Sequence, residues 1–352
     1  MNVFELLYKA LELKASDLHL TVGTQPILRI NGTLEAIGDE ILDSENTAAL
    51  IKQLLTSEQL DQLNNCGELD FAYADTSGSR FRINAYKQKD SYAAAIRVIN
   101  SRIYSMEELG LPPILKELSM KQRGLILVTG PTGSGKTTTL ASMLDYINKN
   151  RKCHIMTLED PIEYLHKHHH SIINQREIGR DSKSFGNALR AALRQDPDVI
   201  LVGEMRDLET ISTALTAAET GHLVLSTLHT IGAAKTIDRV IDVFPPHQQQ
   251  QIRVQLATVM EAIISQQLVP TADGKKRVAA QEIMIGNPAV KNLIREGKAY
   301  QIQNLIQTGS KLGMCSMDSS LGQLYRQMHI SKEAALEHCI DRDMLERLLL
   351  GN

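Results

Sequence analysis

The stretch "GLILVTGPTGSGKTT", residues Gly124 to Thr138, decides the fold of this chain. Its apolar start predicts a buried strand, and the pattern after Lys136 predicts a helix. The glycine-rich turn between them matches G-x-x-x-x-G-K-[ST], whose backbone N–H groups wrap nucleotide phosphates at a helix N-terminus. We therefore predict an ATP site with Lys136 on the β- and γ-phosphates and Thr137 on Mg²⁺. Its predicted residues are Gly130, Pro131, Thr132, Gly133, Ser134, Gly135, Lys136, Thr137 and Thr138.

Three further apolar runs follow, each trailed by helical sequence: "HIMTLED" from His154, "DVILVGE" from Asp198 and "HLVLSTLHT" from His222. Near-continuous apolar strands separated by helices predict a parallel sheet covered on both faces, and hence an α/β fold. Ligands of such sheets bind beyond the carboxyl ends of the strands. The residues that follow each strand are therefore the candidates for chemistry.

Acidic residues stand at two of these strand ends. Glu159, Asp160 and Glu163 lie in "EDPIEY", and Glu204 follows the next strand. ATP hydrolysis needs a carboxylate to orient or deprotonate water and others to hold Mg²⁺ or its waters. We predict that Glu204 and Glu163 share this task, with Glu204 linked to Mg²⁺ through water, and which of them is the general base stays open. A plain acidic loop is the alternative reading of "EDPIEY".

Histidines flank the fourth strand, His222 at its start and His229 past its end. An extended chain would separate them by roughly 20 Å, so both cannot easily touch one phosphate. We assign His229 to the γ-phosphate side as a catalytic candidate, whereas His222 is equally compatible with packing. The cluster His166 and His168–His170 lacks matching partner ligands at metal-site spacing, which favours a surface loop.

Arginines form the remaining charged candidates. Positive charge on the transferred phosphoryl group is often supplied by a neighbouring subunit. "RFRIN" and "AAIRVI" place arginines within apolar runs, where a purely solvated role is less comfortable. The candidates for such contacts are Arg82, Arg97, Arg190, Arg194, Arg206 and Arg239, and a surface role is the alternative for each.

Composition excludes several classes of protein. The 352 residues are 43% hydrophobic and carry a net charge of −3, which argues against disordered, fibrous and nucleic-acid-coating chains. The cysteines, Cys66, Cys153, Cys315 and Cys339, form no CxxC pair and indicate reduced thiols in the cytoplasm. No apolar run approaches the roughly 18 residues of a membrane span, so we expect none.

Changes of pattern predict four segments. Residues 1–100 mix helices with alternating strands, and residues 101–118, rich in turn residues around Pro112 and Pro113, are interpreted as a linker. The nucleotide-binding core then covers residues 119–287, and residues 288–352 are helical.

These motifs together resemble the secretion and type IV pilus ATPases. "GPTGSGKTTT", "TLEDPIEY", "DPDVILVGEMRDLET" and "TGHLVLSTLHT" are similar to that family's Walker A, aspartate box, Walker B and histidine box. The resemblance implies a RecA-like core with a PAS-like N-terminal domain, assembled as a homohexamer on the cytoplasmic side of the inner membrane. It also implies a pilus platform protein as partner and a Mg²⁺-dependent ATPase cycle that drives pilus retraction and twitching motility.

Two features favour the retraction branch of this family. The N-terminal module starts at once, and no cysteine lies between Cys153 and Cys315, where extension and secretion relatives carry a four-cysteine insert. The retraction motif A-I-R-N-L-I-R-E reads "AVKNLIRE" here, so Val290 and Lys291 depart from it. The alternatives are an accessory retraction ATPase working with a paralogue, a pilus extension or type II secretion ATPase, a RecA-like DNA translocase, and a scaffold that binds ATP without hydrolysis. The acidic balance and the lack of an aromatic-basic tract argue against direct nucleic-acid binding.

Overall fold

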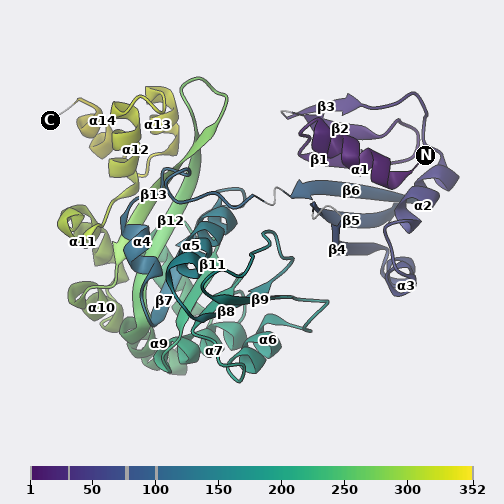
Figure 1. Cartoon of the computed structure of the whole chain (residues 1–352). Helices are drawn as coiled ribbons and strands as arrows, with labels where there is room; N and C mark the ends of the chain where they lie inside the picture. Colours follow the sequence, from purple (N-terminus) through teal and green to yellow (C-terminus); the bar gives the residue numbers. More distant parts are fainter. Residues whose placement is uncertain (1, 31, 76–78, 100–101, 351–352) are drawn as a thin grey trace. The chain divides into compact units, whose positions relative to one another are not determined.

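The computed structural model describes residues 2–30, 32–75, 79–99 and 102–350 and divides the chain into two units (Figure 1). The first unit comprises Met1–Arg102 together with the short segment Pro161–Leu165. The second comprises Ile103–Asp160 and His166–Asn352. Residues 100 and 101, where the predicted linker begins, lie outside the described residues.

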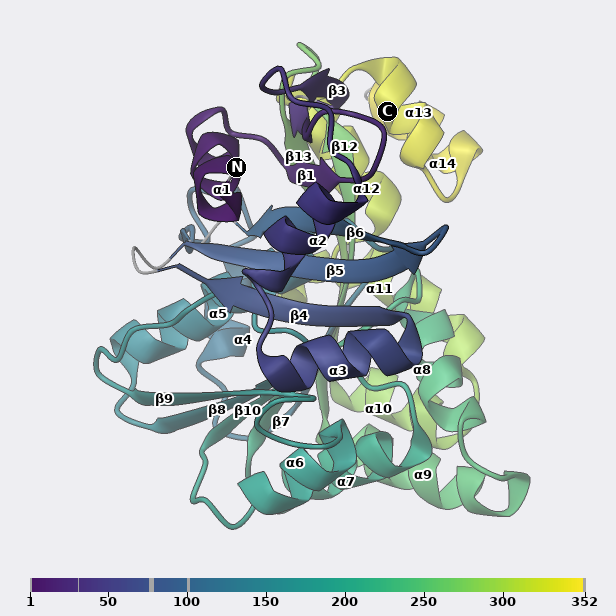
Figure 2. The same cartoon turned by 90° about the vertical axis from the view of Figure 1, so that its right-hand side faces the viewer.

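The first unit is a six-stranded antiparallel sheet with three helices, in the strand order β3-β2-β1-β6-β5-β4. Figure 2 shows β6, β5 and β4 side by side, with α3 next to β4. Its elements are α1 (Val3–Glu12), β1 (Asp17–Leu20), β2 (Ile27–Ile30), β3 (Thr33–Ala36), α2 (Ser44–Lys52), α3 (Ser57–Cys66), β4 (Glu68–Ala74), β5 (Arg80–Gln88) and β6 (Ser91–Ile99). The predicted α+β character of this part is confirmed.

Local sequence sets the boundaries and faces of these elements. A capping box between Thr56 and Gln59 begins α3, and Gly67 in the left-handed region ends it. On β5, Phe81, Ile83 and Ala85 are fully buried, whereas the alternate residues face away from the core. This period of two is the mark of a sheet that buries one face.

The second unit contains a seven-stranded sheet in the order β13-β12-β7-β11-β10-β8-β9, parallel except for the β12–β13 pair. The predicted parallel sheet is confirmed. Its strands are β7 (Gly124–Thr129), β8 (His154–Glu159), β9 (Ile172–Glu177), β10 (Val199–Val202), β11 (Leu223–Leu228), β12 (Met260–Pro270) and β13 (Arg277–Ile285). Its first helices are α4 (Ile114–Ser119), α5 (Lys136–Asn150), α6 (Phe185–Ala192), α7 (Leu208–Glu219), α8 (Ala233–Asp242) and α9 (Pro246–Val259).

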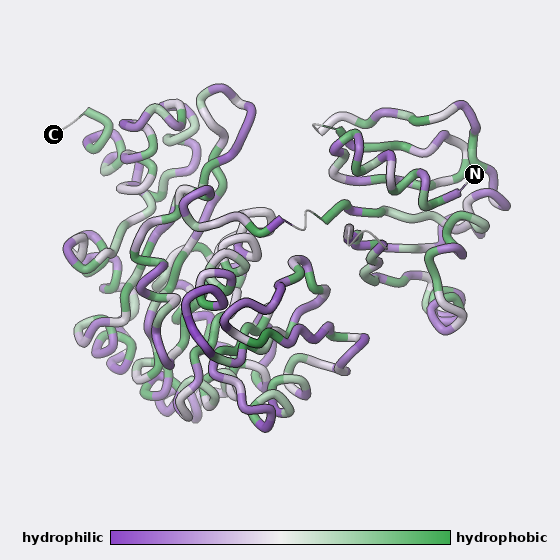
Figure 3. Tube along the Cα trace, viewed as in Figure 1, coloured by the Kyte–Doolittle hydropathy of each residue, from purple (hydrophilic) through white to green (hydrophobic). Residues whose placement is uncertain are grey.

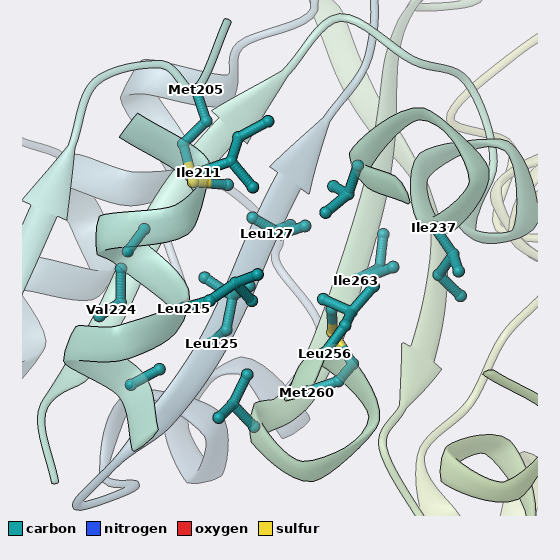
Figure 4. Packing of buried hydrophobic residues seen from close by; sticks show 14 of the residues in the cluster. Leu125, Leu127, Met205, Ile211, Leu215, Val224, Ile237, Leu256, Met260 and Ile263 are labelled. Carbon is teal, nitrogen blue, oxygen red and sulfur yellow. The ribbon is translucent and has the colours of Figure 1, made fainter. Parts of the chain in front are cut away.

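Helices cover both faces of this sheet because its strands are apolar on both sides. Leu125 and Leu127 of β7 pack in a cluster with α6 to α9, and Figure 4 shows them beside Leu215 and Leu256. The alternate residues Ile126 and Val128 pack in a second cluster with α4 and α5. Two buried faces explain why the strands read as continuous apolar runs rather than as alternation.

The segment interpreted as a linker, residues 101–118, packs within the second unit from Ile103 onward. Met106, Leu115 and Leu118 are buried in the cluster that covers α5 and β7. Its prolines resemble those of a linker, but its apolar residues match the spacing of a short packed helix, α4.

The predicted C-terminal helical region consists of α10 (Pro288–Arg295), α11 (Ile302–Thr308), α12 (Met317–Arg326), α13 (Lys332–His338) and α14 (Arg342–Leu350), with short 3-10 turns at Ala299–Gln301 and Ser310–Leu312. Met317, Leu321 and Leu345 of these helices share a small core with Val269 of β12. Figure 3 shows β12 and β13 as largely hydrophobic, with a hydrophilic turn between them. Among the described residues, no helix is both long and apolar enough to cross a membrane.

Candidate functional site

The glycine-rich loop, Gly130–Gly135, joins β7 to α5. Gly130, Gly133 and Gly135 have φ values of 143°, 79° and 84°, a region that residues with a Cβ rarely adopt. A Cβ on Gly130 would also lie 2.2 Å from the backbone oxygen of Gln266 on the neighbouring strand β12. The sequence needs glycine here because both the turn and the close approach of β12 exclude other residues.

Lys136 is buried at the first turn of α5, with 8% of its surface exposed. Its Nζ donates to the carbonyl oxygens of Gly130 at 2.9 Å and Pro131 at 3.0 Å. These bonds hold the ammonium over the glycine-rich loop. Thr137 and Thr138 follow in the same turn and are half-buried.

Two hydroxyl oxygens beside the glycine-rich loop, Thr129 Oγ1 and Ser134 Oγ, are buried and have no hydrogen-bond partner among the described residues. An orphaned buried hydroxyl costs about 1–3 kcal/mol. Phosphate oxygens are the strong acceptors that such hydroxyls and the loop N–H groups can bind. The donor set therefore fits a nucleotide phosphate.

The sequence reasoning missed Gln266, which lies on β12 and is 2% exposed. Its Nε2 donates to the Ser134 carbonyl at 2.6 Å, and its Oε1 accepts from Thr139 Oγ1 at 2.8 Å. Gln281 Nε2 on β13 donates to the same Oε1 at 2.7 Å. A polar residue within an apolar strand was the one available signal.

Glu204 lies just past the end of β10, beside two of the other candidates. Its Oε2 is 3.6 Å from His229 Nε2, and its Oε1 is 2.7 Å from Arg206 Nε. Thr227 Oγ1 donates to the Gly203 carbonyl at 2.6 Å, which ties this turn to β11. The Glu204 side chain is 20% exposed and Arg206 73%, so the carboxylate is sheltered while the guanidinium faces outward.

Strand register brings this cluster to the same edge as the glycine-rich loop. Thr129 pairs with Leu228 and Val202 pairs with Ser226, all in parallel strands. The carboxyl ends of β7, β11 and β10 therefore open side by side, and the residues that follow them share one edge of the sheet. That edge combines a loop suited to phosphates with a carboxylate and an imidazole, a combination that suits phosphoryl chemistry.

The aspartate-box candidates are dispersed. Glu159 is 7% exposed, and its Oε1 accepts from Thr157 Oγ1 at 2.6 Å and Gln175 Nε2 at 3.1 Å. Asp160 follows it and is exposed. Glu163 belongs to Pro161–Leu165, which groups with the first unit, so its role stays a prediction.

His222 lies at the amino end of β11, opposite His229. Its Nδ1 is 2.9 Å from the Ala217 carbonyl, and its own carbonyl accepts from Gly124 N at the start of β7. This position serves the turn between α7 and β11.

The arginine candidates occupy separate places. Arg190 pairs with Glu209 at 2.6 Å, while Arg194 and Arg239 are exposed. In the first unit, Arg82 and Arg97 are opposite each other on β5 and β6. Arg82 contacts Asp70 at 2.6 Å, and Arg97 contacts Asp17 at 3.0 Å. Two cations in direct register on an exposed face are compensated here by acids on the flanking strands.

The histidine-rich segment gives no metal centre within the part of the chain that the structure describes. His168 Nδ1 accepts from the backbone of Ile173 at 3.0 Å, which closes the turn before β9. Burial lowers the pKa of His166 to about 4, partly offset by the Asp145 carboxylate. His166 is therefore neutral at pH 7.

Comparisons with known proteins place the chain among secretion and pilus proteins. A family model described as "Type II/IV secretion system protein" matches residues 2–342. A Pseudomonas aeruginosa protein named "Type IV pilus retractation ATPase PilT" is 49% identical, over 96% of this chain and 98% of the relative. The "Type IV pilus ATPase PilU" of the same organism is 40% identical, over 96% of this chain and 88% of the relative. A crystal structure titled as the pilus retraction motor PilT with bound ADP has a TM-score of 0.92, 48% identity and 99% coverage of both chains.

Proposed function

Because the chain belongs to the Type II/IV secretion system protein family, we propose that it is an ATP-hydrolysing motor that retracts type IV pili. The observation that carries this proposal is the shared strand edge. It presents the glycine-rich loop with Lys136 together with the Glu204–His229 pair. The ADP in the solved relative supports nucleotide binding at this edge.

In the proposed reaction, backbone N–H groups of the glycine-rich loop hold the phosphates. Lys136 turns from the carbonyls of Gly130 and Pro131 toward the β- and γ-phosphates. Glu204 orients and deprotonates the attacking water, and His229 contacts the γ-phosphate side. Arg206 keeps the Glu204 carboxylate ionised and aligned.

Mg²⁺ fits the donor set of this edge. The Thr137 hydroxyl and the Glu204 carboxylate are oxygen ligands, the type that Mg²⁺ prefers, and it needs only one or two of them besides phosphates and water. When bound, the ion would neutralise the charge that develops on the transferred phosphoryl group. Thr137 would hold it directly and Glu204 through water.

Assembly and partners complete the proposal. A homohexamer at the cytoplasmic face of the inner membrane would bring Arg82, Arg97, Arg190, Arg194 or Arg239 of one subunit to the site of its neighbour. A pilus platform protein would receive the motion, which produces twitching. The 40% identity to a second pilus ATPase supports an accessory retraction role as the alternative.

Phosphate release from the purified protein tests the enzymatic part. We expect turnover with ATP and Mg²⁺, loss of turnover when EDTA is added, and no stimulation by single-stranded DNA. Absence of turnover in a folded, nucleotide-bound preparation would favour a scaffold, and strong stimulation by single-stranded DNA would favour a translocase.

A further inference from the structure

Gln266 is the one buried side chain that joins the glycine-rich loop to both α5 and the β12–β13 pair among the hydrogen bonds described. Its carboxamide contacts Ser134, Thr139 and Gln281, at 2.6 to 2.8 Å. Both glutamines are 2% exposed, so water does not compete for these bonds. A satisfied polar network in a dry interior fixes one arrangement of its members.

The orientation of this carboxamide follows from what each partner can do. The Ser134 carbonyl can only accept, so it places the nitrogen of Gln266 on the loop side. The oxygen then faces Thr139 and Gln281, which both donate to it. A flipped amide would set two acceptors against each other at Ser134.

Peptide geometry carries this orientation into the glycine-rich loop. In a planar trans peptide the C=O and the following N–H point to opposite sides. Anchoring the Ser134 carbonyl toward β12 therefore aims the Gly135 N–H away from β12. Gly135 itself leaves no room for adjustment, because its φ is 84° and a Cβ there would lie 2.9 Å from Gln266 Nε2.

We propose that Gln266, oriented by Gln281, is a positioning residue that aims the Gly135 N–H at the β-phosphate of a bound nucleoside di- or triphosphate. The proposal rests on nucleotide binding by the glycine-rich loop as proposed above. It adds a part of the site contributed by a strand more than a hundred residues later in the chain. Gln266 acts through the backbone of Ser134 and Gly135 and does not touch the nucleotide.

The test compares calorimetric ADP affinity in wild type, Gln266→Met, Gln266→Glu and Thr139→Val. Met keeps the length of the side chain without its hydrogen bonds, and Glu keeps the acceptor but removes the donor to Ser134. An N–H bond to a charged phosphate is worth about 10- to 100-fold in affinity, so both should weaken ADP binding by that factor. Thr139→Val leaves the donor to Ser134 intact and should stay within about threefold of wild type.

Kinetics separate positioning from a general structural role. The β-phosphate contact exists in both ground and transition states, so KM for ATP should rise while kcat changes little. Either Gln266 variant binding ADP like wild type while folded would overturn the proposal, as would equal losses in Thr139→Val.

A failure of the underlying function looks different. If wild type binds ADP and Lys136→Ala does not, the nucleotide site stands and only the Gln266 variants judge the positioning role. If wild type itself does not bind ADP, the proposed function falls, and the positioning role with it.

Discussion

His166 makes the stability of the second unit depend on pH. Burial lowers its pKa from 6.5 to about 4, because the charged imidazolium loses hydration at this site. Its Nδ1 is buried without a hydrogen-bond partner among the described residues, so no acceptor offsets that loss. The folded state prefers neutral histidine. The resulting stability is complete above pH 6.5 and is lost as the pH falls toward 4.

The magnitude follows from the two pKa values. At about pH 5 the unfolded chain binds the proton and the folded chain mostly does not, which removes about 2 kcal/mol of stability. In a unit of this size that corresponds to a fall of about 4–8 °C in the unfolding midpoint. Calorimetric melting of wild type and His166→Asn at about pH 7.5 and pH 5 measures it. Wild type should lose that much more than the variant.

The exposed His169 provides the matched control. His169→Asn should keep the wild-type difference between the two pH values. Equal losses in wild type and His166→Asn would refute the reasoning, because the buried imidazole would then contribute nothing to the pH dependence.

Further substitutions test the site and its support. Glu204→Gln should lower kcat by about 100-fold or more while ADP affinity survives, and near-normal phosphate release would contradict the assigned role. Gly133→Ala has open space around its Cβ and should cost about 1–2 kcal/mol, measured by melting. Gly130→Ala meets the backbone of Gln266 and should cost more and abolish ADP binding; equal effects would argue against the steric account. Ile294→Ala, fully buried in α10, should cost about 2–5 kcal/mol, whereas the exposed Arg295→Ala should melt like wild type.

Short-range features of the fold were predictable from the sequence. The glycine spacing located the turn between β7 and α5, and the apolar runs located β8, β10 and β11. These features depend on residues that are neighbours in the chain, where periodicity and turn chemistry act directly. The same reasoning located Glu204 and His229 after their strands.

Long-range pairing was not predictable in the same way. Gln266 reaches the glycine-rich loop only because β12 pairs with β7, a choice made between strands far apart in sequence. Likewise, the Glu204–His229 contact needs the register between β10 and β11. The segment around Pro112 and Pro113 misled because turn residues dominate its pattern, while Leu115 and Leu118 are buried only through contact with α5.

Pilus number in living cells tests the retraction function most directly. A strain lacking this protein is complemented with wild type or with Lys136→Ala, and surface pili are counted by electron microscopy beside a twitching assay. Without the lysine that reaches the phosphates, extension should continue while retraction stops. The account predicts excess pili and no twitching with Lys136→Ala. Cells without pili would contradict it.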